Sequence, residues 1–420
     1  MRRPYKLINT IQEYAWGSPR LMPELIGRKN PEEKPFAEMW MGVHPRGPSV
    51  VEDPEGNRNL SDFIKSSPER VLGKEISERF GGELPFLFKV LSAGKPLSIQ
   101  AHPDKKQAEE GFEREERKGV PLDAFSRNYR DRNHKPEVIC ALTPFTAMCG
   151  FKTAAEIAAG FENTEAPAVR TKLLPPLSSA EVLDEADKIR GFFNTLMTLD
   201  AEDKEELVRG IVSWAGGDSG EEARLVLRFH ELHGTDIGVA APLYLNVLTL
   251  QEGQALYQPA GVLHAYVEGM GVELMANSDN VLRGGLTQKH VDVEELLSLL
   301  SFQPIRPDII TPVETLPKVD EYPLPIDEFV LRRVRVEGAD VEISRRTSLE
   351  IGICTEGECT LLPSAAANDG DYGETETSRK GAFSSLTIER GESFVAPYDF
   401  SSYRLSGEGK VYIAAVPSGS

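Results

Sequence analysis

Cysteine is scarce in this sequence, and no long hydrophobic run occurs in it. The four cysteines, Cys140, Cys149, Cys354 and Cys359, are too few and too scattered to staple a chain of 420 residues. No apolar run reaches the roughly 18 to 20 residues that cross a bilayer. The basic N-terminus is not followed by the apolar segment of a secretory signal. We therefore expect a cytoplasmic protein with reduced thiols and no membrane attachment.

Positively charged residues are in the minority as well. The chain has 47 Lys and Arg against 66 Asp and Glu, a net charge of −19. Nucleic acids and anionic membranes require a basic surface, so neither is expected as a partner. A local group of Lys and Arg is informative in such a chain, because an anionic substrate would have to be bound by positive residues clustered within a protein that is negative overall.

The length exceeds what one hydrophobic core usually supports, so several domains are expected. Short apolar runs separated by Gly and Pro predict mainly strands in residues 1–151 and again in 242–320. Residues 152–241 are predicted to be a helical insertion between them. Residues 321–420 are predicted to be a separate block of short strands. Helical spacing of apolar residues predicts helices over 181–198, 200–214, 220–233 and 292–302.

One strand, residues 97–102, alternates strictly between apolar and polar residues. Alternate side chains of a strand share a face, so Ser98, Gln100 and His102 point the same way. Gln and His at i, i+2 can form half of a metal site, although the exposed face of a surface strand would look the same. Lys89 lies in another, apolar strand, where it either extends its ammonium to water or directs it into a pocket.

The stretch from Gly253 to His264 carries the most specific pattern. It matches G-x5-P-x-G-x2-H, the second signature of the cupin superfamily. In that pattern Pro259 and Gly261 turn the chain between two strands, and the His enters the barrel. Glu268 stands where the signature usually ends in Asn, and the usual first cupin motif is absent.

Gln100 and His102 occupy the place of that first motif, and the missing carboxylate must come from elsewhere in the chain. Glu137, in His-Lys-Pro-Glu at the start of an apolar run, is the candidate. Residues 391–397 repeat the G-x5-P spacing, but Ser402 stands where the first copy has its His. The repeat predicts a second barrel without a metal ligand.

Six motifs combine these features. They are Tyr14–Gly17, Glu38–Pro45, Ile99–Asp104, His134–Glu137, Pro259–Tyr266 and Ser278–Lys289. In this order they resemble type I mannose-6-phosphate isomerases, and the resemblance covers nearly the whole chain. It implies a mainly β fold of two cupin-type jelly-roll barrels with an inserted α-helical domain.

The resemblance also implies one Zn²⁺ per chain, held by Gln100, His102, Glu137 and His264. Two imidazoles, a carboxylate and an amide oxygen form a borderline set of N and O donors that suits zinc. The neutral Gln leaves the metal more positive than a third His or carboxylate would. The implied reaction interconverts mannose 6-phosphate and fructose 6-phosphate through a cis-enediol, which requires a base that reaches both C1 and C2.

Arg283, Glu273 and Lys135 are the predicted catalytic residues. Arg283 is placed in the active site by the resemblance; otherwise it would be an ordinary loop Arg. Glu273 points away from its apolar neighbours in the strand and is the candidate base. His134 and Lys135 are the other candidates for the base. If Glu273 has no catalytic role, it would form an ion pair with Arg283. The predicted substrate-binding residues, the last four by resemblance only, are Ser98, Lys89, Lys289, Trp16, Glu38, Tyr266 and Asp279.

Two other function classes stay open at the level of sequence. One is a different cupin enzyme, such as an iron-dependent oxygenase, against which Gln in the ligand set and the Lys- and Arg-rich pocket argue. The other is a non-catalytic protein that binds a sugar or phosphate. The expected partner is a small phosphorylated sugar, and the expected state is a monomer.

Overall fold

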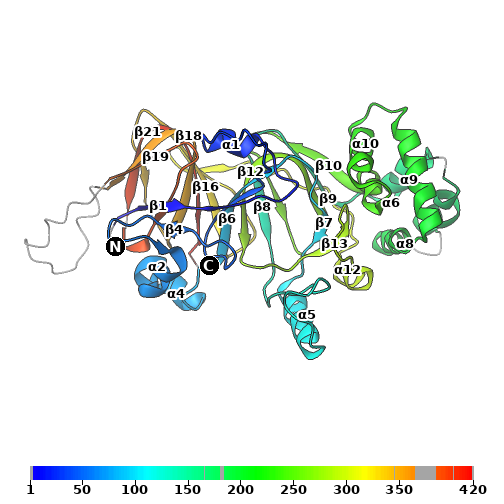
Figure 1. The fold of residues 1–420 in the computed structure, drawn as a ribbon, viewed down its shortest axis with the longest axis horizontal. Helices are drawn as coiled ribbons and strands as arrows, with labels where there is room; N and C mark the ends of the chain where they lie inside the picture. The colour runs from blue at the N-terminus through cyan, green and yellow to red at the C-terminus, as the bar shows by residue number, and fades with distance from the viewer. Residues whose placement is uncertain are drawn as a thin grey trace, which may run out of the picture.

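A computed structural model describes residues 3–164, 166–179, 184–344, 346–364, 385–400 and 402–418. Two antiparallel sheets lie side by side, and helices extend from one end of the molecule (Figure 1). The predicted β-rich chain with a helical insertion is confirmed at this level. In the part of the chain described, no helix is long and apolar enough to cross a membrane.

The first sheet has ten strands and carries most of the predicted site residues. Its strands are β2 (Thr10–Gln12), β3 (Glu38–Met41), β6 (Phe86–Ala93), β7 (Ile99–Ala101), β8 (Glu137–Ala141), β9 (Phe145–Phe151), β10 (Leu245–Leu250), β11 (Ala255–Gln258), β12 (His264–Ala276) and β13 (Leu282–Gly285). The long strand β12 pairs with β7 and β9 through its first half and with β6 and β8 through its second half. Between the halves lies Gly269, with φ +117° and so little space that a Cβ would come within 2.6 Å of the Pro144 oxygen.

Within the described residues the second sheet has eleven strands, and it joins the two ends of the chain. Its strands are β1 (Tyr5–Ile8), β4 (Val50–Val51), β5 (Arg58–Asn59), β14 (Val313–Leu316), β15 (Val319–Glu321), β16 (Val330–Glu337), β17 (Val341–Ile343), β18 (Glu350–Pro363), β19 (Leu386–Glu389), β20 (Ser393–Ala396) and β21 (Tyr403–Ala415). Strand β1 pairs with β20 on one side and β4 on the other. The N-terminal strands therefore belong to the sheet of the C-terminal block, which their sequence does not indicate.

The helical segment agrees with the sequence. It comprises α6 (Ala154–Glu162), η1 (Val169–Leu173), α7 (Leu174–Ser178), α8 (Glu185–Met197), α9 (Ala201–Ala215), α10 (Glu221–His233), η2 (Ile237–Ala240) and α11 (Ala241–Tyr244). Residues 181–183 of the helix predicted over 181–198 lie outside the described residues. The helix predicted over 292–302 is α12 (Val293–Leu299).

Residues 1–151 contain helices that the prediction of mainly strands did not include. They are α1 (Leu21–Leu25), α2 (Leu60–Ser66), α3 (Pro68–Leu72), α4 (Lys74–Arg79) and α5 (Lys105–Arg117). Helix α5 buries only Ala108, Gly111 and Glu115, so it has no apolar periodicity to detect. Its capping box between Asp104 and Gln107 was the available signal.

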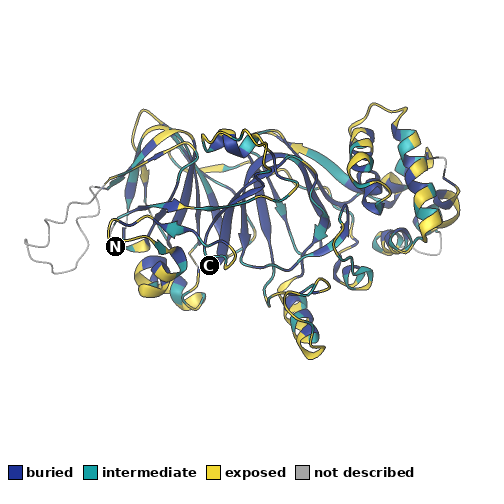
Figure 2. Cartoon of the chain, viewed as in Figure 1, coloured by how far each residue is buried: buried dark blue, intermediate teal, exposed yellow. Residues whose placement is uncertain are grey.

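The core is continuous between the two sheets. Val90 of β6 and Val272 of β12 belong to the same buried cluster as Ile351 and Tyr412 of the second sheet. A second cluster joins the helical segment to the first sheet, with the rings of Phe151 and Phe193 5.3 Å apart. Figure 2 shows the strands largely buried and the outer helices exposed. All four cysteines are free and buried.

Candidate active site

A cavity of about 720 Å³ collects the predicted site residues. Those that line it are Trp16, Glu38, Lys89, Ser98, Gln100, Lys135, Glu137, Tyr266, Glu273, Asp279, Arg283 and Lys289. The two remaining residues, His102 and His264, are not among the cavity-lining residues described but lie next to Glu137, which is. Segments more than 200 residues apart in sequence thus meet at one place.

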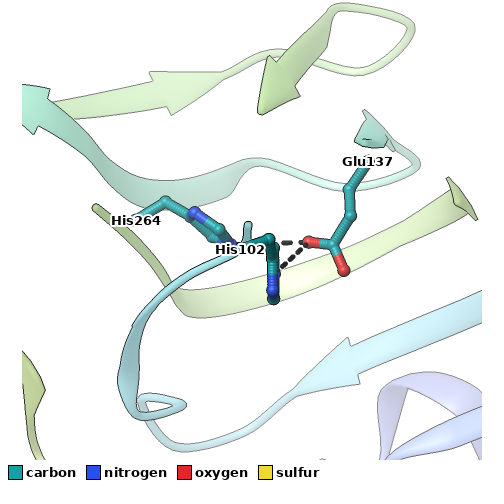
Figure 3. A group of neighbouring side chains, drawn as sticks. All are labelled: His102, Glu137 and His264. Carbon is teal, nitrogen blue, oxygen red and sulfur yellow. Dashed lines mark ion pairs between the residues drawn. The ribbon is translucent and has the colours of Figure 1, made fainter. Parts of the chain in front are cut away.

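His102, Glu137 and His264 form a compact group of potential metal ligands. The Nε2 atom of each His lies 3.4 Å from Oε2 of Glu137 (Figure 3). One ligand atom from each residue lies within 4.8 Å of the other two, and all three residues are buried. This is the geometry of three side chains that converge on one point.

The backbone fixes both imidazoles with their Nε2 atoms toward that point. Nδ1 of His102 lies 2.8 Å from the Asn280 carbonyl oxygen, and Nδ1 of His264 lies 3.0 Å from that of Val262. A carbonyl only accepts, so each Nδ1 carries the hydrogen and each Nε2 keeps its lone pair. Backbone carbonyls orient metal-binding histidines in this way.

The three converging atoms are buried and have no hydrogen-bond partner. Burial and the nearby Lys135 lower the pKa of His102 to about 4, so its ring is neutral near pH 7 and cannot form an ion pair with Glu137. Two imidazole lone pairs and a carboxylate oxygen therefore face one another, which is unfavourable without a cation. The donor set fits zinc.

Glu137 is ionised despite its burial. Burial alone would raise its pKa, but the ammonium of Lys135, whose Nζ lies 2.8 Å from Oε1, outweighs burial and holds the pKa well below the usual range. Gln100 lies beside this group in the sheet. Across neighbouring strands it faces His264 on one side and Arg283 on the other, which places the three side chains in one row.

Lys89 and Glu273 form a second charged group in the cavity. They occupy facing positions of β6 and β12, with Nζ 3.1 Å from Oε2 of Glu273 and 3.7 Å from Oε2 of Glu38. Burial raises the pKa of Glu273, partly offset by Lys89. Burial opposes the charge of Lys89, but the carboxylates of Glu273 and Glu38 outweigh it and raise the pKa of Lys89. The ammonium of Lys89 thus points into the cavity and not to bulk solvent.

Arg283 has no carboxylate at ion-pair distance within the described residues, so Glu273 pairs with Lys89 and not with it. Burial and the neighbouring Arg130 lower the pKa of Arg283. Burial, Arg283, Arg130 and Arg46 lower the pKa of Lys289 in the same way. A concentration of cations that disfavour one another is suited to an anionic ligand.

Comparison with known proteins identifies the family. Residues 5–154 match the model of the phosphomannose isomerase type I catalytic domain. Mannose-6-phosphate isomerase of Escherichia coli (strain K12) is 40% identical over 361 residues, which cover 85% of this chain and 90% of that protein. The Homo sapiens mannose-6-phosphate isomerase is 35% identical over 368 residues, 81% of this chain and 84% of that one. The chain belongs to the type I phosphomannose isomerase family.

Solved structures of phosphomannose isomerases have the same fold. A mutant of the enzyme from Salmonella typhimurium, 34% identical, aligns with a TM-score of 0.88 over 98% of this chain and 99% of that one. A zinc-bound mannose 6-phosphate isomerase, 35% identical, aligns with a TM-score of 0.87 over the same shares of the two chains, 98% and 99%. In this phosphomannose isomerase, His102, Glu137 and His264 form a buried group of ligand atoms that could hold a metal ion.

Several residues that line the cavity are not among the site residues predicted from the sequence. They include Tyr14, Trp40, His44, Arg46, Arg130 and His233. Tyr14, Trp40 and His44 lie within the quoted motifs and Arg46 directly follows one, and that position was the available signal. His233 lines the cavity from the end of α10, a placement that only the packing of the helical segment reveals. His134, in contrast, bonds Glu328 at 2.6 Å and is not part of the cavity lining.

Proposed function

We propose that this phosphomannose isomerase interconverts D-mannose 6-phosphate and D-fructose 6-phosphate in the 720 Å³ cavity, using one Zn²⁺. The protein is a mannose-6-phosphate isomerase. The observation that carries the proposal is the convergence of three unpaired buried acceptor atoms, from His102, Glu137 and His264, beside a cavity with unpaired cations. Gln100, next to His264 in the sheet, is proposed as the fourth ligand.

The metal, when bound, supplies positive charge that polarises sugar oxygens. Arg283 and Lys135 both line the cavity and are proposed to stabilise negative charge that develops on the enediolate oxygens. Arg283 suits this task because no carboxylate among the described residues neutralises it. Lys135, 2.8 Å from Glu137, also keeps that carboxylate ionised.

Glu273 is proposed as the base that moves the proton between C2 and C1. Its pKa is raised by burial, which makes the ionised carboxylate a stronger base. Lys89, 3.1 Å away, fixes the carboxylate in the cavity. The rival His134 is held by Glu328 away from the cavity, and the rival Lys135 is engaged by Glu137.

The phosphate is proposed to bind near Ser98, Arg283 and Lys289. Burial, and after it repulsion by the neighbouring cations, lowers the pKa of Lys289, and a phosphate dianion would relieve that repulsion. The sugar hydroxyls are proposed to contact other cavity-lining residues, most of which are aromatic or carry a carboxylate. The residues proposed for this contact are Trp16, Glu38, Lys89, Tyr266 and Asp279.

Each sheet is proposed to close into a jelly-roll barrel of the cupin type. A strand that pairs with different partners in its two halves, as β12 does, is typical of sheets that fold over on themselves. The proposed domains are residues 1–151 with 242–320, 152–241, and 321–420. Because β1 pairs with β20, the first residues of the chain would complete the C-terminal barrel.

We further infer a cytoplasmic monomer that binds neither nucleic acid nor membranes. Four free buried thiols fit a reducing compartment. A net charge of −19 disfavours polyanionic partners.

The experiment is a coupled assay for fructose 6-phosphate formed from mannose 6-phosphate. It is run on purified protein, on chelated protein, and after zinc is added back. Activity that disappears with the metal and returns with zinc supports the proposal. No activity in folded, zinc-loaded protein would favour a non-catalytic sugar phosphate-binding role instead.

Arg283→Ala tests the assignment of roles within the site. The variant is expected to keep its fold and zinc but to lose turnover by about a hundredfold or more, because one stabilising charge is removed from the developing enediolate. Lys95→Ala, which removes another cation of the cavity wall, is the matched control and is expected to lose much less. Normal turnover by Arg283→Ala would remove Arg283 from the mechanism.

A further inference from the structure

The loop after β13 forms one wall of the cavity. Leu286, Thr287, Gln288 and Lys289 all line it, and Lys289 is the proposed phosphate-binding cation. This loop is not supported by the first sheet alone. It packs against the turn between α10 and η2, which belongs to the helical segment.

Asp236, in that turn, holds the loop through its carboxylate. Oδ1 accepts hydrogen bonds from the backbone N–H of Gly238 at 2.7 Å and of Leu286 at 2.8 Å. Oδ2 lies 3.4 Å from the backbone N–H of Thr287. One side chain of the helical segment thus satisfies two backbone donors of the cavity wall.

The same set of hydrogen bonds continues to Lys289. Its backbone N–H donates to Oγ1 of Thr287 at 3.0 Å. A short connected route therefore leads from Asp236, through Leu286 and Thr287, to the backbone of the phosphate-binding Lys.

The backbone at the contact is unusual on both sides. Leu286 has φ +52°, a left-handed conformation that is unfavourable for a residue with a Cβ. Gly285 has φ +135°, and a Cβ there would come within 2.8 Å of Cα of Gly238. A Cβ on Gly238 would lie 2.6 Å from the nitrogen of Leu286. Such conformations persist only where surrounding contacts fix them, and here Asp236 is the contact.

We propose that Asp236 is a positioning residue for the substrate phosphate, acting through the loop that carries Lys289. This rests on the proposed function, because it takes Lys289 as a phosphate ligand. It also gives the helical segment a task in the reaction: it shapes the anion-binding wall of the cavity. Asp236 itself does not line the cavity and is not a catalytic residue.

Asp236→Ala is the test. We expect KM for mannose 6-phosphate to rise about tenfold or more while kcat changes less, since a charge-assisted contact is lost from the phosphate side only. The inhibition constant of inorganic phosphate is expected to rise by a similar factor, with zinc content unchanged. Asp236→Asn keeps an acceptor oxygen for Gly238 and Leu286 and is expected to show a smaller increase.

The matched control is Asp200→Ala. Asp200 also caps a helix of the same segment, accepting from the N–H of Asp203 at 2.9 Å, but it has no contact with the cavity loop. Its KM is expected to stay near that of the wild type. Thr287→Val removes the hydroxyl that accepts from the backbone N–H of Lys289. This variant is expected to raise KM and the phosphate inhibition constant, and it tests the inference even if Asp236→Ala does not fold.

The double variant Asp236→Ala, Lys289→Ala separates positioning from general structural damage. If Asp236 acts through Lys289, its loss adds less than about threefold to KM in the Lys289→Ala background. A full tenfold effect there, or an unchanged KM and phosphate inhibition constant in folded Asp236→Ala, would overturn the inference. Calorimetry with inorganic phosphate keeps the two proposals distinct: an inactive wild type would defeat the function, whereas equal phosphate binding by wild type and Asp236→Ala would defeat the positioning role.

Discussion

Lys89 and Glu273 face each other across neighbouring strands, with 3.1 Å between the ammonium nitrogen and a carboxylate oxygen. Glu38 lies on the other side of the same ammonium, at 3.7 Å. One buried cation thus balances two buried carboxylates in the cavity wall. Trp40, opposite Lys89 on β3, donates its indole N–H to Glu38 at 2.5 Å and completes the group.

Lys89→Met is therefore expected to be costly. It leaves two carboxylates without their cation in a site where the Lys89 side chain is only 8% exposed. Removal of one partner from a buried pair typically costs about 3–5 kcal/mol, so the free energy of unfolding measured in urea should fall by that order. Lys106→Met, at a side chain 83% exposed, is the control and should change it little. Equal stability of Lys89→Met and wild type would show that the pair does not hold the site together.

The pH dependence of turnover should report on Glu273. As a base it must be ionised, so kcat/KM is present above its pKa and falls as the pH drops through it. Because burial raises this pKa from its ordinary value of 4.5, the acid limb is expected above pH 4.5. The nearby charge of Glu38 raises the same pKa, so Glu38→Gln should shift the limb to lower pH.

The profile is measured as kcat/KM for mannose 6-phosphate in wild type and Glu38→Gln at constant ionic strength. Glu52→Gln, an exposed carboxylate outside the cavity, should leave the limb in place. A limb that stays fixed in Glu38→Gln, or moves to higher pH, would point to a group other than Glu273.

Much of the candidate site could be predicted because its proposed ligands lie in local patterns. His264 follows a Pro-x-Gly turn, and Gln100 and His102 alternate on one strand. The roles of Arg130 and Asp236 could not be predicted in that way. Arg130 depends on how a long loop approaches the cavity, and Asp236 depends on contact between two segments 50 residues apart. Local periodicity does not contain such information.

The same distinction applies to the fold. Helices α8, α9 and α10 were predicted because each buries an apolar face at helical spacing. Helix α5 was missed because it buries little. The pairing of β1 with β20 joins residues nearly 400 positions apart, as in Tyr5 with Val395. Strand pairing over such separations follows from the packed core and not from any segment by itself.

Removal of the metal should destabilise the protein as well as inactivate it. The unpaired acceptors of His102, Glu137 and His264 would again face one another without a cation. A ligand at one hundred times its Kd stabilises by about 2.7 kcal/mol, so chelation should lower the melting temperature, and zinc should restore it.

His264→Ala should contain little zinc by elemental analysis and should no longer respond to chelation. His230→Ala is the control, because His230 is half-buried at the end of α10, is not among the cavity-lining residues described, and bonds the Gly234 carbonyl at 2.8 Å. Full zinc occupancy in His264→Ala would mean that the metal lies elsewhere.

Gln100 offers the sharpest test of how the metal charge is used. It faces both His264 and Arg283 in the sheet. Gln100→Glu adds a negative donor of almost the same shape, so zinc should bind at least as tightly. The net positive charge available to sugar oxygens would fall, and Arg283 would gain a carboxylate neighbour. Turnover should therefore drop about tenfold or more, which is less than the roughly 10²–10³-fold loss found when one stabilising donor is removed entirely. Gln100→Ala, in contrast, should first lose affinity for zinc. Elemental analysis after dialysis would measure that loss, and assays at saturating zinc would measure turnover separately from it. If Gln100→Glu kept full turnover with bound zinc, the neutral amide would have no part in setting the charge of the site.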